Sequence, residues 1–94
     1  MKIPDFLKST YTMLYQAFPN GVDEESYWAL LYLLYDYMAD ENLALIMSAF
    51  VDRSLGVITN DIYKVHQMKF NKKAIKEVKR ELDKCGFEDW KKEV

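Results

Sequence analysis

His66 and Cys85 are the two side chains of this sequence whose types most often do chemistry, and each type occurs once. An imidazole and a thiol form a metal site or a nucleophile–base pair when further ligands or a third group join them. Here the two residues lie nineteen positions apart, and this spacing matches no metal-binding pattern. Cys85 also continues the apolar stripe of a predicted helix, which favours a small core residue. We expect His66 to be solvated or hydrogen-bonded, and neither residue to be catalytic.

The acidic residues make no stronger case for catalysis. Asp23, Glu24 and Glu25 lie where a helix is predicted to begin, as do Asp40 and Glu41. Carboxylates at such positions cap the helix and interact favourably with its dipole. The three glycines are far apart, so they form no phosphate-binding loop. We predict a protein without enzymatic activity and without a metal or other cofactor.

The apolar spacing and the capping residues predict helices along the whole chain. The first is expected to begin near Pro4, and residues 53–58 are expected to form a loop. Five helices are predicted, at about 4–18, 24–39, 41–52, a short fourth that Thr59 caps, and 72–84, which Asn71 caps. No segment alternates with period two for long, and 94 residues leave no room for two cores. We predict an all-α protein, a compact bundle of about five helices in one domain spanning residues 1–94.

The second predicted helix is apolar around most of its circumference, so we expect it at the centre of the bundle. The expected core comprises Leu7, Leu14, Leu30, Leu31, Leu34, Phe50, Ile62, Val78 and Leu82. A separate stripe of the same helix carries Trp28, Tyr32 and Tyr35. Tyrosine and tryptophan have polar tips and are enriched at interfaces. The stripe is therefore either covered by another helix or a surface for protein binding or self-association.

The last predicted helix is strongly basic. The chain carries a net charge of −2, but residues 60–94 hold ten basic and seven acidic side chains. Four opposite pairs are spaced for contact on this helix, which predicts a solvated, salt-bridged face: Lys73–Glu77, Glu77–Arg80, Lys79–Asp83 and Glu81–Lys84. Alternatively, residues 58–82 form a helix-turn-helix that binds nucleic acid. Its contact residues would be Lys69, Lys72, Lys73, Lys76 and Arg80. The glycine expected in the turn of that motif is absent, and the sequence pI is about 5.3.

The turn Phe18-Pro19-Asn20-Gly21-Val22 and the helix after it resemble a signature of a small bacterial family of unknown function with mycobacterial members. The closing residues 84–87, followed by Trp90, are also similar to that family. Phe18 stands where the family tends to have Tyr, and Asp23 replaces a proline. The resemblance implies a compact helical bundle and no catalytic or ligand-binding residues.

Composition and charge bound the remaining possibilities. The N-terminal residues lack the apolar core of a signal peptide, and no apolar run is long enough to span a bilayer. A single cysteine fits a reducing compartment. We therefore predict a cytoplasmic protein that does not enter membranes. Its expected function is that of a small interaction or regulatory module for another protein or a second copy, with nucleic-acid binding as the alternative.

Overall fold

A computed structural model describes residues 3–69 and 71–93, and these form six α-helices, one short 3₁₀ helix and no strand. Their bounds are η1 Asp5–Leu7, α1 Lys8–Ala17, α2 Glu24–Leu34, α3 Asp40–Phe50, α4 Leu55–Val65, α5 Lys72–Lys84 and α6 Phe87–Glu93. The all-α prediction is confirmed. The number of helices is six in these residues, where about five were predicted.

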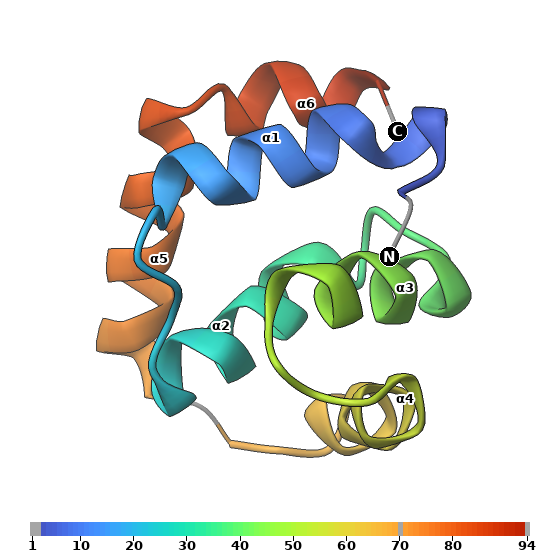
Figure 1. Cartoon of the computed structure of the whole chain (residues 1–94). Helices are drawn as coiled ribbons and strands as arrows, with labels where there is room; N and C mark the ends of the chain where they lie inside the picture. The colour runs from blue at the N-terminus through green and yellow to red at the C-terminus, as the bar shows by residue number, and fades with distance from the viewer. Residues whose placement is uncertain (1–2, 70, 94) are drawn as a thin grey trace.

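The central position of α2 follows from its contacts. α5 packs against α2 on one side and α4 packs against it on the other (Figure 1). α1 contacts α3, α5 and α6, while α3 covers α4. The predicted central helix therefore does lie between its neighbours, because its apolar residues face several directions.

The core residues predicted from helical spacing are buried in eight of nine cases. The exception is Phe50, which is only partly buried and packs against the edge of the core. It is the last residue of α3, and its ring meets that of Tyr11 edge-on, with 6.5 Å between centroids. A terminal residue of a helix has neighbours on fewer sides, so helical spacing overestimated its burial.

Two predicted helix boundaries are wrong. α2 ends at Leu34 and not near Ala39, because the Tyr37 N–H bonds to the Leu34 carbonyl at 3.0 Å and tightens the chain into a turn. α4 begins at Leu55, so most of the expected loop is helical. Its cap is Ser54, whose side chain accepts the N–H of Val57 at 3.3 Å.

Four predicted caps can be compared with the structure. The Asp23 carboxylate accepts the Ser26 N–H at 2.8 Å, as expected for the start of α2. Asn71 caps α5 in the same way. Thr59, in contrast, lies inside α4 and donates its hydroxyl to the Leu55 carbonyl at 2.8 Å. Asp40 is also not a cap, since it already belongs to the first turn of α3.

The sixth helix, α6, was not predicted. Gly86 adopts φ +88°, a left-handed conformation that favours glycine, and turns the chain from α5 into α6. α6 has only seven residues, but Phe87 and Trp90 are buried. The Trp90 indole N–H donates to the buried Thr10 hydroxyl at 2.7 Å, which fixes α6 against α1. Two buried aromatic rings and one hydrogen bond hold a helix too short to recognise by its period.

Candidate interaction surface

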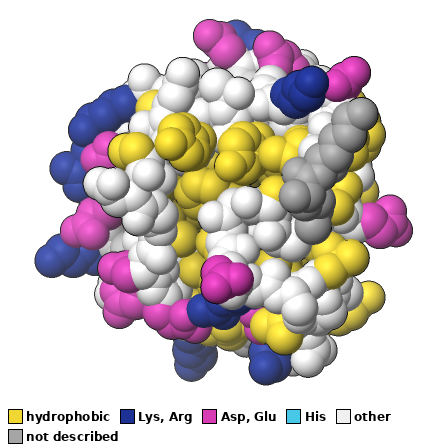
Figure 2. Space-filling view, viewed as in Figure 1, with side chains coloured by type: hydrophobic (Ala, Val, Ile, Leu, Met, Phe, Trp, Pro, Cys, Tyr) yellow, Lys and Arg dark blue, Asp and Glu magenta, His cyan; other side chains and the backbone are white. Residues whose placement is uncertain are grey.

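The outer side of α5 carries most of the basic side chains that were predicted as contacts for nucleic acid. Helical spacing places Lys72, Lys73, Lys76 and Arg80 on the side away from α2, and all four are exposed. Lys69, in the segment before α5, is exposed as well. Figure 2 shows Lys and Arg side chains along the edge over α5, with acidic side chains between them. We call these five residues the basic face.

Two of the four ion pairs expected along α5 form. Lys79 lies 2.9 Å from the Asp83 carboxylate, and Lys84 lies 3.2 Å from that of Glu81. Both pairs belong to the second half of the helix. The prediction of a salt-bridged face is confirmed there, and these ion pairs account for Lys79 and Lys84.

The first half of α5 is different. The two pairs predicted for Glu77, with Lys73 and Arg80, do not form. No member of the basic face makes an ion pair with any residue in the described ranges 3–69 and 71–93. Direct contact with a carboxylate therefore does not neutralise its charge in this part of the chain.

The position of these lysines is unfavourable for the helix itself. Lys72 and Lys73 lie in the first turn of α5, which has no acidic residue. Positive charge there is disfavoured by a few tenths to about 1 kcal/mol per exposed side chain. Asn71 offsets part of this cost, since its Oδ1 accepts the Lys73 N–H at 3.0 Å. Residues that are unfavourable for their own helix, as positive charges at its N-terminus are, and that do not otherwise stabilise the fold are expected at functional sites.

The aromatic stripe of α2 is half-buried and is neither core nor a fully open surface. Trp28 and Tyr35 are partly buried, and Tyr32 is 38% exposed. The segment between α4 and α5 runs beside the stripe. His66, at the start of that segment, places its ring edge-on to Tyr35 at 4.3 Å between centroids. Partial burial, followed by the nearby charge of Asp36, raises the pKa of Tyr35.

A hollow lies at the Trp28 end of the stripe, beside the start of the basic face. It has a volume of about 250 Å³ and is open to solvent. Its lining residues are Glu25, Trp28, Met68, Lys69, Asn71 and Ala74. We call it the Trp28 hollow. It joins the predicted aromatic stripe to the predicted basic residues, which the sequence alone did not place side by side.

The Trp28 ring is held in place from α2 and from the loop before α4. Its indole N–H donates to Oε1 of Glu24 at 3.1 Å. The other oxygen of Glu24 accepts a hydrogen bond from the Arg53 guanidinium. Arg53 also lies over the ring of Tyr27, with 4.1 Å from Cζ to the ring centroid. We call the Arg53–Glu24–Trp28 chain of contacts the arginine clasp.

A buried carboxylate anchors the arginine clasp. Asp61 is 6% exposed and accepts the Tyr27 hydroxyl at 2.7 Å and the Arg53 guanidinium at 3.4 Å. Burial, together with the hydrogen bond to Asp61, raises the pKa of Tyr27. Partial burial lowers the pKa of Arg53, but the hydrogen bond and charge of Glu24 outweigh it and raise that pKa overall. The cluster therefore holds a neutral phenol and one cation beside the side chains of Glu24 and Asp61.

Sequence reasoning missed this cluster, although one signal was present. Asp61 falls between Ile58, Ile62 and Val65 on the inward stripe of α4, where a carboxylate needs a partner. Nothing in the sequence indicates that the partner is Tyr27, 34 residues earlier, since that pairing depends on how α2 and α4 pack.

The structure does not form a compact helix-turn-helix in residues 58–82. α4 packs against α3 and α2, and α5 packs against α2, α1 and α6. Figure 1 shows α4 and α5 apart from one another. In a helix-turn-helix a turn of three or four residues joins the two helices, whereas here residues 66–71 separate them. The basic face remains a candidate for binding nucleic acid, but not in this geometry.

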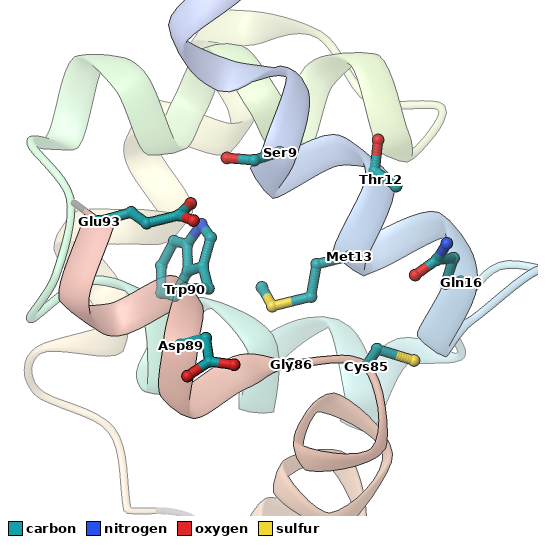
Figure 3. Close-up of a pocket in the computed structure, with 9 residues that line it drawn as sticks. All are labelled: Ser9, Thr12, Met13, Gln16, Cys85, Gly86, Asp89, Trp90 and Glu93. Atoms are coloured by element: carbon teal, nitrogen blue, oxygen red, sulfur yellow. The ribbon is translucent and has the colours of Figure 1, made fainter.

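A second hollow, of about 280 Å³, lies between α1 and α6 (Figure 3). Its lining residues are Ser9, Thr12, Met13, Gln16, Cys85, Gly86, Asp89, Trp90 and Glu93. Met13 and Trp90 project into the space between the helices, whereas the Cys85 thiol points away from both. Cys85 is partly buried and unpaired. His66 does not line this hollow, so the fold does not bring His66 and Cys85 together.

Two further properties concern the described residues only. Among them, no group of three or more His, Cys, Asp and Glu side chains is placed to hold a metal ion. None of their helices has the length and apolar character that crossing a bilayer requires.

Comparisons with protein-family models, with curated proteins and with solved structures find no match to this chain. The resemblance of residues 18–22 to a mycobacterial family therefore stays a prediction.

Proposed function

We propose that this protein is a small non-catalytic interaction module that binds another protein through the basic face and the adjoining Trp28 hollow. The observation that carries the proposal is the state of the basic face: five exposed cations without an ion pair in the described residues, beside a half-buried tryptophan. Unpaired charge costs little in water and becomes an attraction when an oppositely charged partner approaches. The single cysteine fits a reducing compartment, so the proposal includes a cytoplasmic location.

The surface around the hollow has both signs of charge, which favours a protein over a polyanion as the partner. Asp23, Glu24 and Glu25 begin α2 in succession, and Glu25 lines the hollow itself. A nucleic-acid backbone would be repelled there, because every nucleotide carries a negative charge, whereas a polypeptide can place an uncharged residue beside these carboxylates. Tryptophan, tyrosine and exposed methionine are enriched at protein interfaces, where they provide the apolar contact.

Site-specific photo-crosslinking in the cell of origin tests this proposal. A photoreactive residue at position 73 or 68 should give one discrete protein adduct, and the same residue at position 92 on α6 should not. The adduct should disappear when Lys72→Glu and Lys76→Glu are added. An adduct of twice the chain mass would identify the partner as a second copy. Absence of a discrete adduct, or equal adducts from positions 73 and 92, would contradict the proposal.

Nucleic-acid binding is the second candidate, and the same observation favours it. Lys69, Lys72, Lys73, Lys76 and Arg80 would contact phosphates, and each contact would release a counterion. Binding of a labelled mixed-sequence duplex, followed by fluorescence anisotropy, should then weaken sharply as salt increases and be lost in Lys72→Glu with Lys76→Glu. Absence of binding at low salt would eliminate this candidate and leave the protein interface.

A further inference from the structure

We infer that the partner is an acidic, extended segment of another protein that places one large apolar side chain in the Trp28 hollow and its carboxylates on the basic face. This inference rests on the proposed function and adds the chemistry of the partner. It follows from the lining of the hollow, from the spacing of the lysines beside it and from the contacts that hold Trp28.

The hollow is suited to a single side chain. Its apolar lining comes from Trp28, Met68 and Ala74, and Met68 is 41% exposed. Its volume of about 250 Å³ is below the range of about 300–1,000 Å³ typical of small-molecule pockets. Methionine adapts its shape to different partners, so the hollow accepts more than one kind of apolar side chain.

The polar rim of the hollow fits a polypeptide backbone. The Oδ1 atom of Asn71 is already used, because it accepts the Lys73 N–H. Its NH₂ group has no acceptor among the described residues and can donate to a carbonyl of the partner. Across the hollow, Glu25 has carboxylate oxygens that can accept a backbone N–H. A peptide offers both groups next to one apolar side chain.

The lysines have the spacing of an extended acidic segment. Lys72 and Lys76 are four residues apart on α5, which corresponds to about 6 Å along the helix axis. Alternate residues of an extended chain are about 6.5 Å apart and point to the same side. Two carboxylates at alternate positions would therefore reach both lysines. Lys69 would meet a third nearer the hollow.

The arginine clasp makes Trp28 a preorganised contact. Its ring is restrained by Glu24 and packs edge-on against Tyr27, with 5.4 Å between centroids. A side chain already restrained in the free protein loses less conformational entropy on binding. Glu24 in turn is held by Arg53. Arg53 is therefore a positioning residue, since it acts on the partner through Glu24 and Trp28.

Binding of labelled peptides rich in Asp and Glu tests the inference. Each peptide has Leu or Phe at its centre, and a matched control peptide has Ala at that position. At low salt the Leu or Phe peptide should bind about tenfold or more tightly than the Ala peptide. Lys72→Glu should abolish binding, whereas Lys92→Glu, which changes the net charge equally on α6, should leave it unchanged. Met68→Glu should remove the preference for Leu over Ala while keeping the fold, since Met68 is an exposed side chain.

A positioning role for Arg53 has its own readout. Arg53→Lys keeps the charge but not the planar fork that holds Glu24. It should shift the NMR signal of the Trp28 indole N–H and weaken binding of the Leu peptide several-fold, while the affinity for the Ala peptide changes little. An unshifted indole signal with unchanged affinity would remove this role.

Two outcomes overturn the inference. If none of the acidic peptides binds, or if Leu and Ala peptides bind equally, the hollow does not select an apolar side chain. If a labelled single-stranded oligonucleotide binds more tightly than every peptide, the surface is a binding site for nucleic acid and not for an acidic peptide. A discrete protein adduct from position 73 with no peptide binding would leave the interaction module in place and refute only the chemistry of the partner.

Discussion

The hydroxyl of Tyr27 lies 2.7 Å from Oδ2 of Asp61 and connects α2 to α4 inside the bundle. Tyr27→Phe removes the donor and keeps the ring, so a buried carboxylate is left with Arg53 alone. Hydrogen bonds to charged groups contribute about 1.5–3 kcal/mol, and we expect a loss of that size in the free energy of unfolding. Chemical denaturation measures it. The matched control is Tyr63→Phe on the exposed side of α4, which should change stability by less than about 0.5 kcal/mol.

Alkaline pH should weaken the fold through the same residue. The pKa of Tyr27 is raised in the folded protein above its ordinary value of 10.0. Below pH 10 both states hold the proton, so the contribution of Tyr27 is complete. Above pH 10 the unfolded state loses the proton while the folded state keeps it, so stability falls, by at most about 1.4 kcal/mol per pH unit. Denaturation at increasing pH should show a steeper decline for the wild type than for Tyr27→Phe. Equal slopes would contradict the burial of this phenol.

The unpaired lysines at the start of α5 should be a cost to stability. Reversing Lys72 and Lys73 to Glu places negative charge at the positive end of the helix dipole. We expect a gain of about 0.3–1 kcal/mol per residue at low salt, and less as salt screens the charges. Lys79→Glu is the opposite case, because it breaks the pair with Asp83 and should cost a few tenths of a kcal/mol. A lower melting temperature for the Lys72→Glu, Lys73→Glu double variant than for the wild type would show that these lysines stabilise the fold after all.

Helix class and the boundaries of α5 could be predicted because they depend on local signals. Asn71 caps α5 and Gly86 follows it, and both signals act within one turn of the helix ends. The end of α2 could not be predicted. Its apolar pattern continues through Met38, but the chain turns at Tyr35–Tyr37 so that α3 can pack against α1 and α4. The packing of distant helices decided that boundary.

The candidate site was predicted only in parts. The basic residues and the aromatic stripe could each be read from helical spacing, but the Trp28 hollow required the segment after α4 to lie beside α2. Arg53 was assigned to a loop, and only the folded chain brings it onto Tyr27 and Glu24. Such contacts between residues far apart in sequence carry no period and no motif.

Replacing Arg53 tests whether the arginine clasp also stabilises the bundle. Arg53→Met keeps much of the apolar stem that packs on Tyr27 and removes the charge shared by Glu24 and Asp61. Because Asp61 is buried, losing a cationic partner should cost about 1–3 kcal/mol of unfolding free energy. The matched control is Arg80→Met, whose guanidinium is exposed on α5 and should be dispensable for stability. Equal stability of the two variants in urea would mean that Tyr27 alone satisfies Asp61.

The hydrogen bond from Trp90 to Thr10 should decide whether α6 stays docked. The two residues are 80 positions apart in the chain, and the bond is buried at 2.7 Å. Thr10→Val keeps the shape of the side chain but leaves the indole N–H without an acceptor, at a cost of about 1–3 kcal/mol. α6 is short and, among the described helices, packs mainly against α1 and α5, so we expect this cost to appear first as local opening of the C-terminal helix. Hydrogen exchange followed by NMR should therefore show faster exchange of the Trp90 indole and of the amides in α6, while amides in α2 keep their protection. Thr12→Val, at an exposed position of α1, should change neither the exchange of the Trp90 indole nor that of the α6 amides. If Thr10→Val accelerates exchange in α2 and α6 alike, α6 opens only when the whole bundle unfolds, and the unpredicted helix is then part of the same cooperative unit as the central one.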